Sequence, residues 1–293
     1  MRSFRKQIIS FGLLLLSLLP FPVLFLIADF LYIVLFYIVR YRTKVVDQNL
    51  RNAFPEKSDK ERYRIKVDFY HFFADLIVEC IKMRSISSTQ AKKRWDLSNV
   101  QELERYFKQK QSILLVTGHY GNWEWGIHCL SLMGLHPPLV VYKPLNDPVF
   151  EGILNLMRSR FGAEMVSTKR VLRKMISMKS ITHSTIFLAD QTPAYGESNL
   201  YIDFLNQETL VYKGIERIAK LTGYPIVFCH IDRPKRGYYS CRFDTIVEYP
   251  KAYEDNKITY LYNNFLESII REKPALWLWS HKRWKHKRAH ESS

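Results

Sequence analysis

The sequence has few cysteines and few glycines for its length. Its 293 residues include 4 Cys and 11 Gly, which excludes a disulfide framework and a collagen-like chain. No Cys-x-x-Cys pair occurs, and each cysteine lies among apolar or aromatic neighbours: Cys80, Cys129, Cys229 and Cys241. A reduced cysteine in such surroundings serves as a small hydrophobic residue. We therefore expect a reducing compartment and no cysteine-based metal site.

Acidic residues are also scarce relative to basic ones. The chain has 44 Lys and Arg against 28 Asp and Glu, a formal charge of +16. Such an excess favours phosphates, anionic lipid headgroups or nucleic acid as partners. A hydrophobic content of 47% excludes wholesale disorder. The sequence lacks a glycine-rich phosphate loop of either common spacing, and we expect no cofactor, no nucleotide and no metal.

A long apolar run occupies the N-terminus. It extends from Ile8 to Val39 and is broken mainly by Pro20, Pro22 and Asp29. It is longer than the roughly 20 apolar residues that a helix needs to cross a bilayer. It ends in aromatic and basic residues that suit a membrane interface: Tyr32, Phe36, Tyr37, Arg40, Tyr41, Arg42 and Lys44. Residues 1–42 are therefore predicted to be a membrane anchor.

The prolines leave two geometries for this anchor. One kinked helix spans the membrane, or a helix–Pro–helix hairpin enters and returns. Basic residues flank both ends of the run, with Arg2, Arg5 and Lys6 before it, so the positive-inside rule does not choose between the orientations.

Residues 43–293 are predicted to form one α/β domain. Segment 43–95 has helical spacing, and Ser58 and Glu61 form a capping box. Short apolar runs then alternate with helical segments, which indicates a mixed, partly parallel sheet flanked by helices. The predicted strands are 112–117, 139–142, 163–166, 185–189, 201–205, 226–231 and 239–247. The predicted helices are 100–109, 123–133, 149–161, 169–178, 212–221 and 253–272.

His119 is the leading candidate for chemistry. The strand before it ends at Thr117, so His119 lies at the carboxyl end of the sheet, where open α/β sheets bind ligands. Within one continuous helix, Glu124 would diverge from His119 by about 140°. A backbone turn between them, permitted by Gly121 and Asn122, would let Glu124 hold one imidazole nitrogen. The other nitrogen would then accept a proton from a substrate hydroxyl.

This block resembles the late acyltransferases of bacterial lipid A biosynthesis, of lauroyl or myristoyl type, within the lysophospholipid acyltransferase superfamily. Gly118–Glu124 is similar to the family's His-x4-Asp/Glu block. Four further segments are similar in the same order: Asp47–Glu56, Tyr142–Asn146 with Arg158–Gly162, Ala189–Gln191, and Trp279–Lys285. One departure is Tyr201–Asn206, which has no glycine where the family has a Gly/Phe-rich stretch ending in Phe-Phe-Gly.

The resemblance implies a glycerolipid acyltransferase-like fold and a position at the bacterial inner membrane, with the active site facing the cytoplasm. It implies transfer of a fatty acyl group from a thioester, usually on acyl carrier protein, to a hydroxyl of a lipid A precursor. His119 would be the general base, and Glu124 would fix its tautomer. The alternative acceptor is another lipid, such as a lysophospholipid, an aminolipid or a glycolipid.

Four more residues are candidates for substrate binding. Arg158 and Arg160 match the family's basic pair and either bind acceptor phosphate or are solvated charges at a helix end. Asn122 is the fourth candidate, and either Arg158 or a backbone N–H near Gly121–Trp123 would stabilise an oxyanion. Asp190 matches the family's Asp-Gln and orders His119, orders an arginine, or ends its strand as an Asx turn.

The basic tail, His281–Arg288, admits a different class of function. It could serve a membrane-anchored scaffold or contact nucleic acid, in which case His119 would be idle. Beside a membrane anchor we expect the tail to contact lipid headgroups instead, and we expect no nucleic acid. Part of the positive charge would also suit docking of the acidic carrier protein.

Overall fold

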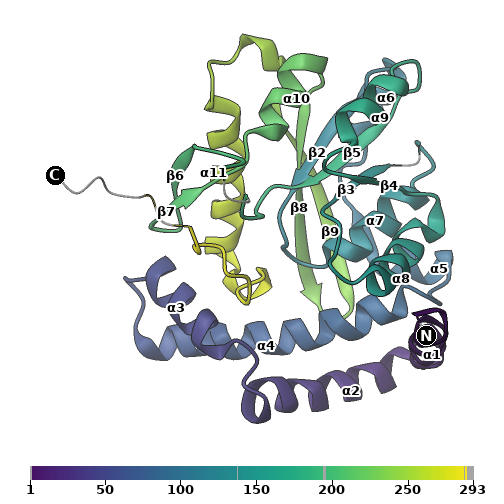
Figure 1. The fold of residues 1–293 in the computed structure, drawn as a ribbon, viewed down its shortest axis with the longest axis vertical. Coiled ribbons are helices and arrows are strands. Elements are labelled where there is room, and N and C mark those ends of the chain that lie inside the picture. The colour runs from purple at the N-terminus through teal and green to yellow at the C-terminus, as the bar shows by residue number, and fades with distance from the viewer. Residues whose placement is uncertain (1, 137, 194–195, 287, 289–293) are drawn as a thin grey trace.

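The computed structural model describes residues 2–136, 138–193, 196–286 and 288, with the side chains of residues 2–6 left aside. A seven-stranded sheet in the order β1-β9-β8-β2-β5-β3-β4 forms its centre, with helices packed around it (Figure 1). Every neighbouring pair is parallel except β8–β9, which confirms the predicted mixed, mostly parallel fold. The strands are β1 (Trp95–Leu97), β2 (Ile113–Thr117), β3 (Leu139–Tyr142), β4 (Glu164–Ser167), β5 (Ser184–Leu188), β8 (Ile226–Lys235) and β9 (Tyr238–Val247).

The middle strands β2 and β5 set the position of the candidate site. They are short apolar runs covered on both faces, as central parallel strands are. Thr117 pairs with Leu188 at the ends of the two strands. Because the strands are parallel and in register, the residues two places further on, His119 and Asp190, emerge together at the carboxyl edge.

The predicted helices are present, with ends displaced by a few residues. They connect and cover the strands: α6 (Gln101–Lys108), α7 (Trp123–Leu132), α8 (Pro148–Arg158), α9 (Val171–Ser177), α10 (Gly214–Thr222) and α11 (Lys257–Glu272). Segment 43–95 divides into α3 (Thr43–Ala53), α4 (Asp59–Lys82) and α5 (Ser88–Lys93). Both hydrogen bonds of the predicted capping box between Ser58 and Glu61 are formed at the start of α4.

Three strands differ from the prediction: β1 and β7 (Gln207–Leu210) were not expected, and β6 (Tyr201–Phe204) lies apart from the main sheet. Trp95–Leu97, expected at the end of a helical segment, is β1 and pairs with β9. β6 forms a hairpin with β7. Its two turn residues, Leu205 and Asn206, both have positive φ (52° and 58°), as a type I′ turn requires. The unfavourable conformation of Leu205 is offset by burial and by its N–H, which donates to Glu267 at 3.0 Å.

The N-terminal run forms two helices with a break before Pro20. They are α1 (Arg2–Leu18) and α2 (Phe21–Ile33), and a π-helical turn (Val34–Ile38) continues the second. α2 runs alongside α4 (Figure 1). The segment Phe21–Ile38 is long and apolar enough to cross a membrane, and 28% of it is buried. The face of α2 toward the protein comprises Phe21, Leu24, Ala28 and Tyr32.

Candidate active site

His119 and Asp190 meet at the carboxyl edge of the sheet. His119 Nδ1 lies 2.7 Å from Asp190 Oδ1, and the backbone N–H of His119 donates to Oδ2 at 2.8 Å. The close approach depends on Gly118, since a Cβ there would lie 2.7 Å from Leu266 Cδ1 and 3.2 Å from Asp190 Oδ2. Of the roles open to Asp190, the structure shows the ordering of His119.

Trp277 provides a third donor to the same carboxylate. Its indole N–H donates to Asp190 Oδ2 at 2.8 Å, and both side chains are buried. Burial alone would raise the pKa of Asp190. The charge of the imidazole and the three donors outweigh burial and hold this pKa well below its usual range. Asp190 is therefore an ionised acceptor that fixes the orientation of the His119 ring.

Glu124 lies in the first turn of α7, as predicted, but it pairs with Arg158. The guanidinium of Arg158 binds the carboxylate through two hydrogen bonds, with Nε at 2.7 Å from Oε2 and Nη2 on Oε1. The carboxylate on the imidazole is thus Asp190, and between the described residues Glu124 and His119 no hydrogen bond occurs. A buried arginine at the end of α8 requires an anion, and Glu124 supplies it. Burial would raise the pKa of Glu124, but Arg158 lowers it below its ordinary value.

Two more predicted site residues are bound within the protein. Asn122 is buried, caps α7 by accepting the Trp125 N–H at 2.9 Å, and donates to Glu79 Oε2 at 2.8 Å. Arg160 donates to the carbonyl oxygens of Met83, at 3.2 Å, and Ile86. Asn122 is fully buried and is not placed to contact a substrate, whereas Arg160 is exposed and binds the end of α4 and the turn after it through one nitrogen.

The comparisons with known proteins show which family the chain belongs to. Residues 2–286 match the family described as bacterial lipid A biosynthesis acyltransferase. The chain belongs to this family. It is similar to a lipid A biosynthesis palmitoleoyltransferase of Escherichia coli K12, at 24% identity over 94% of this chain and 89% of the relative. A lauroyltransferase of the same organism is 24% identical over 91% and 87% of the two chains. A Haemophilus influenzae lipid A biosynthesis acyltransferase is 25% identical over 83% and 78%.

The acyltransferase has a cleft of about 370 Å³ around His119, lined by both polar and apolar groups. Asp190, Trp277 and His281 line one part of it. Burial lowers the pKa of His281 to about 4, so this second histidine is neutral at pH 7. The remaining lining residues include two lysines and several neutral polar groups: Lys143, Asn146, Gln191, Thr192 and Lys285.

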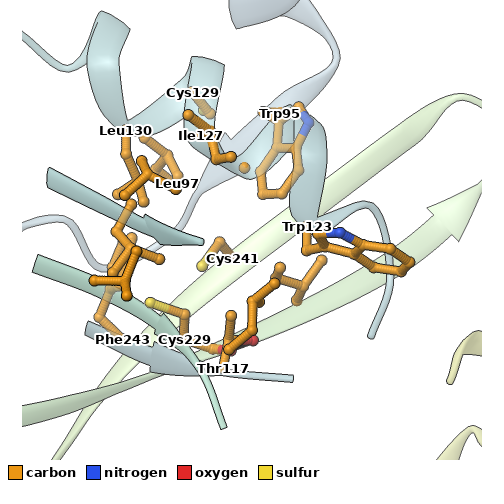
Figure 2. Close-up of a pocket in the computed structure, with 16 residues that line it drawn as sticks. Trp95, Leu97, Thr117, Trp123, Ile127, Cys129, Leu130, Cys229, Cys241 and Phe243 are labelled. Carbon is orange, nitrogen blue, oxygen red and sulfur yellow. Dashed lines mark hydrogen bonds between the residues drawn. The ribbon is translucent and has the colours of Figure 1, made fainter. Parts of the chain in front are cut away.

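Two apolar cavities lie close to His119. The larger, about 480 Å³, shares Lys143, Pro144 and Gln191 with the His119 cleft. The smaller, about 30 Å³, lies between α7 and the sheet, with Trp123 and Thr117 on one side and Trp95 opposite (Figure 2). The ring of Trp123 contacts His119 edge-on, at 4.9 Å between centroids.

Sequence reasoning missed Trp277 and Lys143 as members of this site. Lys143 directly follows β3, which pairs with β5. The signal was therefore present, because the predicted strands placed Lys143 at the same sheet edge as Asp190. Trp277 lies 87 residues from Asp190, outside the matched block Trp279–Lys285, and no local pattern in the sequence marks its contact.

Proposed function

We propose that this acyltransferase moves a fatty acyl group from an acyl thioester, carried by acyl carrier protein, to a hydroxyl of a lipid A precursor. The observation that supports this most is the His119–Asp190 pair in a cleft bordered by an apolar cavity. With Nδ1 held by Asp190, Nε2 is the nitrogen available to a substrate. His119 Nε2 removes the hydroxyl proton as the oxygen attacks the thioester carbonyl.

The second half of the reaction uses the same proton. The tetrahedral intermediate breaks its C–S bond, and the imidazolium returns the proton to the departing sulfur. The negative charge of Asp190 stabilises the imidazolium between the two steps. Glu124 is near enough to interact electrostatically with His119, and its pairing with Arg158 fixes where that charge lies.

The acyl chain is proposed to occupy the larger apolar cavity. Its volume of about 480 Å³ lies in the range of small-molecule sites, roughly 300–1,000 Å³. The smaller cavity, about 30 Å³, has room for about one water. Narrowing the larger cavity with Ile215→Trp should shift the preferred donor to shorter chains. Gly126→Val, which extends toward Trp95 in the smaller cavity, is the matched control.

We also propose that α1 and α2 lie in the membrane interface rather than across it. Asp29, at the middle of the segment Phe21–Ile38, pairs with Arg236 at 2.6 Å, which in turn pairs with Asp75 of α4 at 2.6 Å. A spanning α2 would place these charges at the bilayer centre, where they are costly. The opposite face is apolar and exposed, as in an interfacial helix: Ile8, Phe11, Leu15, Leu18, Leu26, Phe30 and Ile33.

Mass spectrometry of lipid A from cells lacking this chain tests the proposed activity. We expect wild type to restore one acyl chain and His119→Ala to restore none. His136→Ala removes an exposed histidine that does not line the cleft and should restore the acyl chain fully. Restoration by His119→Ala would overturn the proposed base, and a change confined to another lipid class would identify the alternative acceptor.

A further inference from the structure

Two lysines face the same cleft as the proposed catalytic base. Lys143 follows β3 at the carboxyl edge of the sheet, and Lys285 belongs to the C-terminal segment. Both line the cleft of about 370 Å³ with His119, and both are exposed. Two segments 142 positions apart in the sequence thus bring cations to one cavity.

Neither lysine has an anionic partner within the described part of the chain. The salt bridges of the described residues include neither Lys143 nor Lys285. Arg158, by contrast, is neutralised by Glu124. The carboxylate that lines the cleft, Asp190, is 4% exposed and already accepts three hydrogen bonds. Its charge is therefore directed to His119 and Trp277 and away from the two ammonium groups.

The electrostatic balance of the cleft is consequently positive. His281 is neutral at pH 7 because burial lowers its pKa, so the two lysines supply the uncompensated charge. Asn146 and Thr192 add neutral polar groups to the same lining. Lysine binds phosphate well as a compact point charge, and neighbouring amide and hydroxyl donors complete such sites.

We propose that Lys143 and Lys285 form a phosphate-binding subsite beside His119, an inference that rests on the proposed function. The anion is a substrate phosphate, which is carried by a phosphorylated saccharolipid acceptor and by the phosphopantetheine arm of a carrier-protein donor. The subsite holds that phosphate at one end of the cleft, so that the reacting group lies at His119. The resemblance had offered Arg158 and Arg160 either for this task or as solvated charges; in the structure Arg158 pairs with Glu124, and Arg160 donates to the carbonyl oxygens of Met83 and Ile86.

The experiment compares substrates with and without phosphate at each position. The acceptors are a phosphorylated lipid A precursor and the same lipid after phosphatase treatment. The donors are an acyl-phosphopantetheine and the acyl thioester of N-acetylcysteamine, which lacks the phosphate. The variants are Lys143→Ala, Lys285→Ala and the charge-retaining Lys285→Arg. Lys282→Ala is the matched control, because Lys282 is an exposed lysine of the same segment that does not line the cleft.

For each alanine variant we expect KM to rise about tenfold for the phosphorylated substrate, equivalent to about 1.4 kcal/mol, and to stay unchanged for its phosphate-free counterpart. A rise in KM limited to the phosphorylated acceptor assigns the subsite to the acceptor phosphate. A rise limited to the acyl-phosphopantetheine donor assigns it to the phosphate of phosphopantetheine. Lys285→Arg and Lys282→Ala should behave as wild type. Circular dichroism confirms that each variant is folded.

The subsite would be overturned if the alanine variants kept full activity and the KM ratio between phosphorylated and phosphate-free substrate stayed unchanged for both the acceptors and the donors. Failure of the proposed function gives a different result, because wild type would then transfer no acyl group to either acceptor, or His119→Ala would transfer it normally. The two failures are therefore distinguishable in one set of measurements.

Discussion

Replacing Asp190 by asparagine is expected to abolish the base while preserving the fold. Asp190 Oδ2 accepts two N–H groups, the backbone of His119 and the indole of Trp277, each at 2.8 Å. Neither donor can become an acceptor. In Asp190→Asn, the amide oxygen must therefore take the Oδ2 position, and the amide NH₂ must face His119 Nδ1. Nδ1 then accepts a hydrogen bond, and the ring proton moves to Nε2.

A ring protonated on Nε2 cannot take the hydroxyl proton. General-base catalysis contributes about 10²- to 10⁴-fold in rate, so kcat should fall by that factor while KM for both substrates changes little. The hydrogen bonds of the introduced amide remain satisfied, and the melting temperature should stay near that of wild type. Acyl transfer measured by mass spectrometry gives the rate, and the ¹⁵N chemical shifts of His119 report the tautomer directly.

Asp190→Ala is the informative companion variant. It leaves the indole N–H of Trp277 and the backbone N–H of His119 buried without an acceptor, at about 1–3 kcal/mol each. It should therefore lose stability as well as rate, unlike Asp190→Asn. Wild-type kcat in Asp190→Asn, or an unchanged His119 tautomer, would refute the reasoning and return the orienting role to another group.

Three further predictions concern other parts of the protein. Burial raises the pKa of Glu79 to about 7. Above pH about 4.3 the Glu79 carboxyl of the unfolded chain has lost its proton, whereas that of the folded chain keeps it up to about pH 7. The free energy of unfolding therefore falls by about 3 kcal/mol as the pH rises toward 7. In Glu79→Gln, unfolding experiments should show a much smaller fall. Arg158→Met leaves Glu124 buried and unpaired, so it should destabilise the protein by about 3–5 kcal/mol. Adding Glu124→Gln should recover most of the lost stability. Equal stability of the single and double variants would contradict the buried pair. Phe30→Asp should release the enzyme from membranes in an alkaline wash, since a large apolar side chain contributes about 1.5–3 kcal/mol when buried. Leu221 is similarly exposed on α10, so Leu221→Asp should stay bound. Equal release of both variants would contradict the interfacial helices.

The sequence was sufficient for the central strands of the sheet and for the position of His119 at their carboxyl edge. Alternation of apolar runs and helical spacing located the central strands, and those strands placed His119 and Asp190 at one edge. The partner of Glu124 was not predictable in the same way. Glu124 and His119 are five positions apart and suggested a local contact, whereas Arg158 lies 34 residues away on another helix. β1 was missed because of another contact between distant parts of the chain: its three residues form a strand only by pairing with the edge of β9.

The five matched sequence blocks are far apart in the chain, yet the structure shows how two distant ones act on His119. The residues directly before the C-terminal block hold the loop that carries His119: Leu278 N–H donates to His119 O at 3.1 Å, and Gly121 N–H donates to Leu276 O at 3.0 Å. The segment is itself held by α3, where buried Asn49 donates to the carbonyl oxygens of Trp279 at 2.9 Å and His281 at 3.1 Å.

This connection has a consequence for where catalysis takes place. Arg42, at the end of the anchor, also donates to Ser280 O at 2.9 Å, so the residues that leave α2 contact the segment that shapes the cleft. Asp190 in turn receives its third hydrogen bond from Trp277 of this segment. His119 is therefore positioned by a segment that is hydrogen-bonded to residues following the apolar N-terminal helices. If α1 and α2 lie in the membrane interface, as proposed, a lipid acceptor held at the membrane surface would meet His119 at a fixed place, and much of the entropy of bringing the two reacting groups together would be lost on membrane binding.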